Sequence, residues 1–190
     1  MKPQIIDNAL KSEDFQRIQE TLMGDMFPWY WIDYIAGTIP SENTKSRQDS
    51  YTKQTPKTPE DGDNYYFIHQ FYNLILYQEN AIDESTLRLY PEVKAFIDLI
   101  NPKQLLRIKA NLFLKTDEVI HYDNHTDFEF EHKGAILYIN TNNGLTVLED
   151  GTECESVANR LLLFDATKPH HSTTCTDQKR RVNININYEV

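Results

Sequence analysis

Apolar residues recur every three to four positions in two stretches of the chain, a spacing that predicts amphipathic helices. The first helix is predicted to begin with Ser12 as its cap and to run to about Met23, where Gly24 ends it. The second begins at Pro91, a residue suited to the first turn of a helix, and runs to Ile100. The inward faces are apolar: Phe15, Ile18 and Leu22, then Val93, Phe96, Ile97 and Ile100. We expect both helices to brace one side of a sheet.

Two aromatic segments are predicted to be strands, because aromatic and β-branched residues suit a pleated, half-buried surface. They are Phe27–Ile35 and Tyr65–Tyr72, and a shorter extended piece begins at Ile5. We interpret His69 as a core histidine rather than a ligand. The polar segment Thr38–Asn64 is too long for an ordinary connection, so it is either an active-site lid or a mobile surface loop.

Beyond residue 104 the pattern changes to short apolar strands separated by turn residues. The predicted strands are Leu106–Leu114, Ala135–Asn140, Leu145–Leu148, Arg160–Asp165 and Arg181–Tyr188. Tight turns are marked at Asn142–Gly144 and Glu149–Gly151. This spacing predicts a mainly β fold with flanking helices, closed as a sandwich or barrel. We expect a single domain over residues 1–190, with helices and supporting strands in 1–103 and the β core with its metal site in 104–190.

Composition and charge narrow the class of protein. Aromatic residues are abundant, with 11 Tyr and 9 Phe, which favours a globular chain over a disordered one. The formal net charge of −10 disfavours tight binding to nucleic acid or to an anionic membrane. No apolar run approaches 18 residues, so we expect a cytoplasmic protein with Cys154 and Cys175 as free thiols. The oligomeric state stays open.

Two histidines and two aspartates lie within the eight residues 121–128. They form two overlapping His-x-Asp pairs, His121/Asp123 and His125/Asp127. Residues i and i+2 of an extended segment point to one face, so either pair can bring an imidazole and a carboxylate to one point. A second imidazole is available at His170 or His171. Two histidines and one carboxylate are typical of a non-haem iron(II) site with three open positions for substrates and dioxygen.

A candidate cation opens the last predicted strand. Arg180 and Arg181 follow His170 by ten and eleven residues. An arginine there can bind a carboxylate, such as that of a 2-oxo acid, through two parallel hydrogen bonds. If Arg181 faces inward, Asn183 and Asn185 share its face and the residues Val182, Ile184 and Ile186 pack on the other.

At these residues the chain resembles the iron(II)- and 2-oxoglutarate-dependent oxygenases, in particular the prolyl-hydroxylase-like group and the small oxygenases of bacteria and tailed phages. The resemblance covers roughly residues 104–188. The matching segments are Lys109–Leu112, His125–Asp127, Ala135–Asn140, Asn143–Val147, Arg160–Asp165, Pro169–His170 and Arg181–Asn185. The resemblance implies a double-stranded β-helix, which is a jelly-roll or cupin-like barrel.

The resemblance also implies roles for individual residues. Iron(II) would be held by His125, Asp127 and His170. Arg181 would bind the side carboxylate of the cosubstrate 2-oxoglutarate, with the Tyr138 hydroxyl beside it, and Asn111 would reach the other end of the cosubstrate. Phe113 departs from the pattern, since similar proteins often have a tyrosine there that touches the cosubstrate. The implied activity is a dioxygenase reaction that consumes dioxygen and hydroxylates a peptidyl proline, a free amino acid or another small molecule.

Several alternatives remain at this point. The pair His121/Asp123 lies four residues before the preferred pair, and His171 and Arg180 are each one residue from the preferred His170 and Arg181. If His121 is not a ligand, we expect it in a loop near the mouth of the barrel, and we expect His132 to be exposed. Two other functional classes are a cupin-like metal-binding barrel without 2-oxoglutarate and a non-catalytic interaction module. A buried Arg181 discriminates, because a barrel that binds no 2-oxo acid has no need of an arginine beside its metal.

Overall fold

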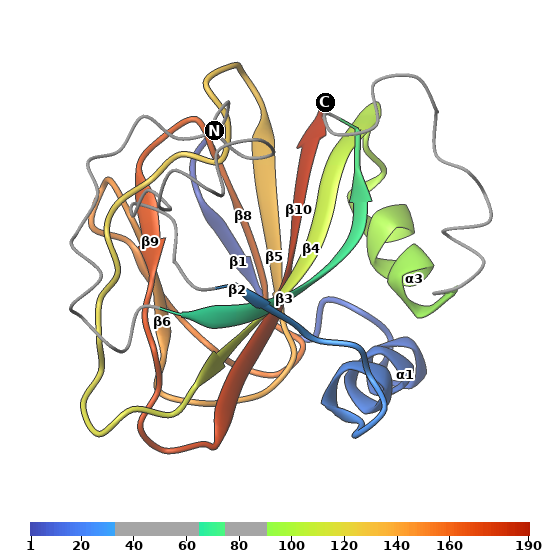
Figure 1. Cartoon of the computed structure of the whole chain (residues 1–190). Coiled ribbons are helices and arrows are strands. Elements are labelled where there is room, and N and C mark those ends of the chain that lie inside the picture. The colour runs from blue at the N-terminus through green and yellow to red at the C-terminus, as the bar shows by residue number, and fades with distance from the viewer. Residues whose placement is uncertain (33–64, 75–90) are drawn as a thin grey trace, which may run out of the picture.

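In the part of the chain that the structure describes, two antiparallel sheets face each other, and two helices pack on the outer side of the larger sheet (Figure 1). The computed structural model describes residues 1–32, 65–74 and 91–190. The predicted lid or loop over 38–64, and the last residues of the strand predicted over 27–35, lie outside the described residues. The mainly β architecture with flanking helices is confirmed, and the sandwich of two antiparallel sheets has the form of a jelly roll.

The larger sheet has seven strands in the order β1-β8-β5-β10-β4-β3-β2. Their bounds are β1 Gln4–Ile6, β8 Leu161–Phe164, β5 Lys133–Tyr138, β10 Arg180–Glu189, β4 Gln104–Leu114, β3 Tyr66–Asn73 and β2 Tyr30–Ile32. The smaller sheet has the order β7-β6-β9, with β7 at Glu153–Glu155, β6 at Leu145–Leu148 and β9 at His170–Ser172. The strands β7 and β9 are absent from the sequence prediction, and the other predicted strands of the β core appear with ends shifted by at most two residues.

The helices α1 (Ser12–Met23) and α3 (Pro91–Ile100) form as predicted. In α1 the predicted inward residues are buried, and they share one core with the outward side chains of β4 and β10. The prediction that Ser12 caps α1 is wrong by one residue. Lys11 takes the cap position without a side-chain hydrogen bond, and Phe15 donates its backbone N–H to the Lys11 carbonyl at 3.0 Å.

Strand β10 alternates between two buried environments, as the sequence pattern predicts. Val182, Ile184 and Ile186 belong to the core beneath the helices. The opposite side carries Arg181, Asn183, Asn185 and Asn187, all buried. A second, smaller apolar cluster lies between the sheets and includes Tyr138, Phe164 and Cys154. The space between the sheets therefore combines a small apolar cluster with a row of polar side chains.

Three smaller expectations are also tested by the fold. Cys154 and Cys175 are free and buried, as predicted. His69 is a core residue, as predicted, and its Nδ1 lies 2.9 Å from the Pro28 carbonyl. Within the described ranges neither helix has the length needed to cross a membrane.

Candidate metal centre

The two candidate histidine ligands are joined through their backbones. His125 and His170 form an isolated antiparallel bridge in which each N–H donates to the other carbonyl at 2.9 Å. His170 opens β9, which pairs with β6, so the segment around His125 adds to the edge of the smaller sheet. The two imidazole rings consequently lie side by side, with centroids 4.6 Å apart. The His170 ring also contacts the ring of Phe164, and the centroids of these two rings are 4.8 Å apart.

The Asp127 carboxylate is held by the larger sheet. Arg107 of β4 forms an ion pair with Oδ1. Asn185 and Asn187 of β10 donate their side-chain amides to Oδ2 at 3.1 and 2.8 Å. Arg107 also donates through Nε to Asn187 at 3.0 Å and lies over the ring of Phe128. Three donors from two adjacent strands thus fix a buried carboxylate that follows a chain bend.

The three side chains converge from the two sheets. One candidate ligand atom from each of His125, Asp127 and His170 lies within 4.8 Å of the others, and this is the one such group found within residues 1–32, 65–74 and 91–190. Each histidine directs Nδ1 at a backbone carbonyl, that of Asp123 at 3.5 Å or Lys168 at 3.1 Å. Metal-bound histidines commonly donate their second nitrogen in this way, which leaves Nε2 with its lone pair for the metal.

Protonation of these groups suits a divalent cation. Loss of solvation lowers the pKa of His125 to about 3, so the imidazole is neutral at pH 7. Burial alone would raise the pKa of Asp127, but Arg107 and the two histidines hold it well below its usual range. Two imidazoles and one carboxylate on one side of an ion leave its other positions open, as in a facial triad. The residues present therefore fit iron(II).

The neighbouring histidines are placed elsewhere. His121 is exposed, and its Nδ1 lies 3.1 Å from Nε2 of His171. His171 is bonded through Nδ1 to the Asn124 amide oxygen at 2.7 Å. The expectation that His132 is exposed is wrong: its ring is 2% exposed, because it packs against Phe128 and Phe130.

Arg181 is fully buried between the sheets, whereas Arg180 is partly exposed and donates to the Met23 carbonyl at 2.6 Å. The Arg181 guanidinium makes its hydrogen bonds to neutral acceptors: the Ser156 hydroxyl at 2.8 Å, the Thr146 hydroxyl and the Leu145 carbonyl at 3.1 Å, and the Ser172 hydroxyl at 3.4 Å. Burial lowers its pKa. No carboxylate of the described residues lies within ion-pair distance of it. A buried charge without a counterion is costly, so this group is suited to an anionic ligand.

The other two candidate residues lie on the same inward surface. The Tyr138 ring centroid is 5.7 Å from the Arg181 guanidinium carbon. The Tyr138 hydroxyl is buried and has no hydrogen-bond partner in the described part of the chain, and loss of solvation raises its pKa. Asn111 donates to the Asn183 side chain at 2.9 Å. Phe113 lies under Arg181 and stacks on Tyr66 with centroids 5.4 Å apart. All six predicted residues therefore lie between the two sheets or at their edge.

Three residues near the site were not singled out from the sequence. Arg107 pairs with Asp127, and Lys109 and Tyr66 lie beside it, with Lys109 Nζ 3.5 Å from the Tyr66 hydroxyl. Burial lowers the pKa of Lys109 to about 7 and raises that of Tyr66 to about 12. The available signal was the polar residue at every second position of the apolar strand β4, which marks an inward polar face.

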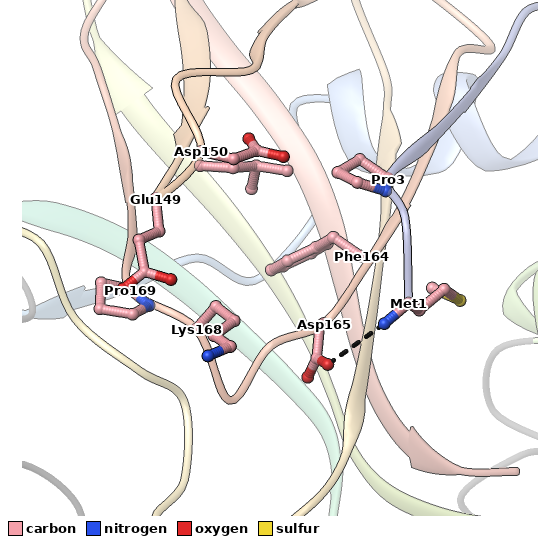
Figure 2. Close-up of a pocket in the computed structure, with 9 residues that line it drawn as sticks. Met1, Pro3, Glu149, Asp150, Phe164, Asp165, Lys168 and Pro169 are labelled. Carbon is pink, nitrogen blue, oxygen red and sulfur yellow. Dashed lines mark hydrogen bonds and ion pairs between the residues drawn. The ribbon is translucent and has the colours of Figure 1, made fainter.

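A cavity of about 200 Å³ is lined by residues that include Phe164, Asp165 and Lys168 (Figure 2). Phe164, whose ring contacts His170, lines one side of this cavity. Asp165 at its edge is already bonded to the Met1 ammonium at 3.4 Å and the Lys133 ammonium at 3.3 Å. None of the six candidate residues lines the cavity, so it is separate from the candidate metal centre.

Comparison of structures identifies known proteins with this fold. A prolyl hydroxylase from Trichoplax adhaerens, solved with a peptide fragment of the hypoxia-inducible factor oxygen degradation domain, matches with a TM-score of 0.59 at 14% identity, over 98% of this chain and 83% of that one. A 2-oxoglutarate–iron(II) oxygenase-family protein from Burkholderia pseudomallei gives 0.56 at 11% identity, over 98% and 85%. The α-ketoglutarate-dependent epimerase SnoN of nogalamycin biosynthesis gives 0.53 at 11% identity, over 98% and 76%. No family model and no curated protein sequence matches the chain. The fold predicted from the sequence, that of the 2-oxoglutarate oxygenases, is confirmed.

Proposed function

We propose that this protein is an iron(II)- and 2-oxoglutarate-dependent dioxygenase that hydroxylates a small molecule or peptide. The observation that carries the proposal is the convergence of His125, Asp127 and His170 between two sheets that also bury Arg181 without a counterion. The first feature suits iron(II), and the second suits a dicarboxylate cosubstrate. Their combination in this fold favours the oxygenase over a metal-binding barrel of other chemistry.

The cosubstrate would be bound at its two ends by different groups. Its side carboxylate would take the place opposite the Arg181 guanidinium, with the unpartnered Tyr138 hydroxyl as an additional donor. Its 2-oxo acid end would bind the metal. Asn111, on the face of β4 that points between the sheets, would reach this end of the cosubstrate. Phe113 lies beneath Arg181 and, unlike the tyrosine that similar proteins often have at this position, offers no hydroxyl to the cosubstrate.

The chain's own residues position and shield the reaction. Bound iron(II) with 2-oxoglutarate and dioxygen supplies oxidative C–H hydroxylation, with succinate and carbon dioxide as co-products. Arg107, Asn185 and Asn187 hold the Asp127 carboxylate in one orientation for the metal that it would bind. The apolar cluster that includes Phe164 lies between the sheets and would limit the access of water to the reacting groups.

Two alternative functions make different demands on Arg181. A cupin-like metal barrel would bind a metal through the same three residues, but it would have no anionic ligand to pair with the buried arginine. A non-catalytic interaction module would need neither a converging triad nor an unpaired buried cation. The epimerase among the proteins of similar fold indicates that this architecture also carries α-ketoglutarate-dependent reactions other than hydroxylation. The test below therefore measures cosubstrate use, which hydroxylation shares with these other reactions.

The proposal is tested by metal binding and by release of labelled carbon dioxide from 1-¹⁴C-2-oxoglutarate. We expect one iron per chain and iron-dependent release in the wild type, and neither in His125→Ala or His170→Ala. The matched controls are His121→Ala and His171→Ala, which remove the adjacent histidines and should keep both properties. Loss of metal in His121→Ala or His171→Ala, with retention in His125→Ala, would contradict the assigned ligands. Tight metal binding without any release of carbon dioxide would favour the cupin-like barrel.

A further inference from the structure

The inward face of β4 carries three polar side chains whose partners differ. Arg107 is ion-paired with Asp127, and Asn111 is hydrogen-bonded to β10. Lys109 lies between them, and its ammonium has no carboxylate within ion-pair distance in the described ranges. It reaches the Tyr66 hydroxyl at 3.5 Å and lies 5.7 Å from the centroid of that ring. Lys109 is thus a basic group between the sheets without an acidic partner among the described residues, and a bound anion would favour its charged form.

A hydrogen-bond acceptor without a donor among the described residues, the side-chain oxygen of Asn185, lies beside Lys109 on the neighbouring strand. Asn185 of β10 pairs in register with Lys109 of β4, so their side chains emerge on the same face about 5 Å apart at Cβ. The Asn185 amide nitrogen donates to Asp127, whereas its oxygen is buried and accepts no hydrogen bond from the described residues. A buried acceptor that is left without a hydrogen bond is destabilising. A ligand that brings an N–H to this oxygen relieves that cost.

The proposed cosubstrate leaves both groups unused. One carboxylate of 2-oxoglutarate faces Arg181, and the other is neutralised by the metal ion that it binds. Arg107 is already committed to Asp127. Among the cations described between the sheets, Lys109 therefore remains for a further anion, and it lies next to the residue pair that supports the metal-binding carboxylate.

We infer that Lys109 and Asn185 recognise the primary substrate, and that this substrate is a free amino acid. Its carboxylate is bound by the Lys109 ammonium with help from the Tyr66 hydroxyl, and its ammonium group donates to Oδ1 of Asn185. The inference rests on the proposed function and narrows its substrate. A proline inside a peptide has neither a free carboxylate nor a free amine, so peptidyl proline is excluded as the substrate class.

The test uses manganese(II)-loaded protein saturated with 2-oxoglutarate, in which the paramagnetic ion broadens the NMR signals of any small molecule bound beside it. Three probes of similar size separate the two contacts: L-alanine has both charged groups, propionate lacks the amine, and L-alaninamide lacks the carboxylate. We expect alanine signals to broaden most, propionate signals less and alaninamide signals least. Binding of 2-oxoglutarate is measured separately by calorimetry on the same samples.

The variants isolate the charge of Lys109 from its bulk. Lys109→Met keeps the length of the side chain without its charge and should reduce the broadening of alanine about tenfold, to the level of alaninamide. Lys109→Arg should restore much of the preference. Lys103→Met removes an exposed lysine just before β4 and is the matched control, which should behave as the wild type.

Each other outcome overturns a defined part of the inference. Equal broadening of the three probes in the wild type, or an unchanged preference for alanine in Lys109→Met, would overturn the amino-acid site. Weaker 2-oxoglutarate binding in Lys109→Met with the alanine preference intact would assign Lys109 to the cosubstrate instead. A wild type that binds no 2-oxoglutarate but shows the Lys109-dependent preference would overturn the proposed function and leave the amino-acid site standing.

Discussion

The two faces of strand β10 are both buried, yet they are built from different chemistry. The face toward the helices is apolar and consists of Val182, Ile184 and Ile186. The face toward the smaller sheet is polar and consists of Arg181, Asn183, Asn185 and Asn187. An apolar face needs only a complementary shape, whereas each buried polar group needs a partner. The polar groups that lack one, the Arg181 charge and the Asn185 oxygen, mark the places where we expect ligands to bind.

The largest effects of substitution are expected at the metal centre. His125→Ala and Asp127→Ala should both abolish iron binding and turnover, but they should differ in stability. Without metal, Asp127→Ala should lower the free energy of unfolding by about 3–5 kcal/mol, because it leaves Arg107 buried without its counterion. His125→Ala leaves no buried charge unpaired and should cost less, about 1 kcal/mol. Urea denaturation of the metal-free variants measures the difference, and equal losses would contradict the assigned support of Asp127.

The apolar face is tested by Ile184→Ala. This side chain is fully buried beneath the helices, so its truncation should lower the free energy of unfolding by about 2–5 kcal/mol. Because Ile184 points away from the metal centre, the iron affinity of the folded protein should stay the same. A stability measurement with an iron titration at low temperature checks both statements. A large loss of iron affinity in a folded Ile184→Ala protein would show that the two faces are not separable.

The ion pair that supports Asp127 is tested by Arg107→Met. Loss of a group that orients a metal ligand typically reduces metal affinity about 10- to 100-fold, and we expect a reduction of that size in iron affinity. Arg17→Met is the matched control, since the Arg17–Asp14 pair lies on the surface of α1 and contributes at most about 1 kcal/mol. Unchanged iron affinity in Arg107→Met would mean that the two asparagines suffice.

A smaller effect is expected at Gly144, which lies against Arg181. A Cβ there would come 2.5 Å from Cδ of Arg181 and 2.7 Å from the Thr174 carbonyl oxygen. Gly144→Ala should therefore displace the guanidinium and raise the 2-oxoglutarate concentration for half-saturation about tenfold, while iron affinity is retained. In Gly151→Ala the added Cβ meets open space at a φ of +82°, so we expect a stability loss of about 1 kcal/mol and no change in 2-oxoglutarate affinity. Equal 2-oxoglutarate affinity in both variants would contradict the placement of Arg181.

Periodicity predicted the elements that owe their shape to local sequence. The bounds of α1 and α3, the alternation along β10 and the burial of Arg181 all follow from spacing. The strands β7 and β9 were not predicted, because each has three residues and forms by pairing with β6. His132 was expected at the surface, but two phenylalanines cover it.

The candidate site was predicted in its ligands but not in their supports. The choice of His125, Asp127 and His170 came from the His-x-Asp spacing and a family resemblance, and these three side chains converge. Arg107 contacts Asp127 across 20 residues of sequence, which no local pattern reveals. The same is true of Lys109 and Tyr66, which meet through the pairing of β3 with β4.

The most direct test of the central claim is an anaerobic titration with iron(II) and then 2-oxoglutarate, in wild type and Arg181→Ala. Chelation of the metal by a 2-oxo acid gives a weak visible charge-transfer band, and we predict this band in the wild type. Arg181→Ala should need at least about 100-fold more 2-oxoglutarate to reach half of the band, because a buried carboxylate loses its only charged partner at that end. A wild type without the band, or a variant that reaches half of it at the same concentration, would contradict the account.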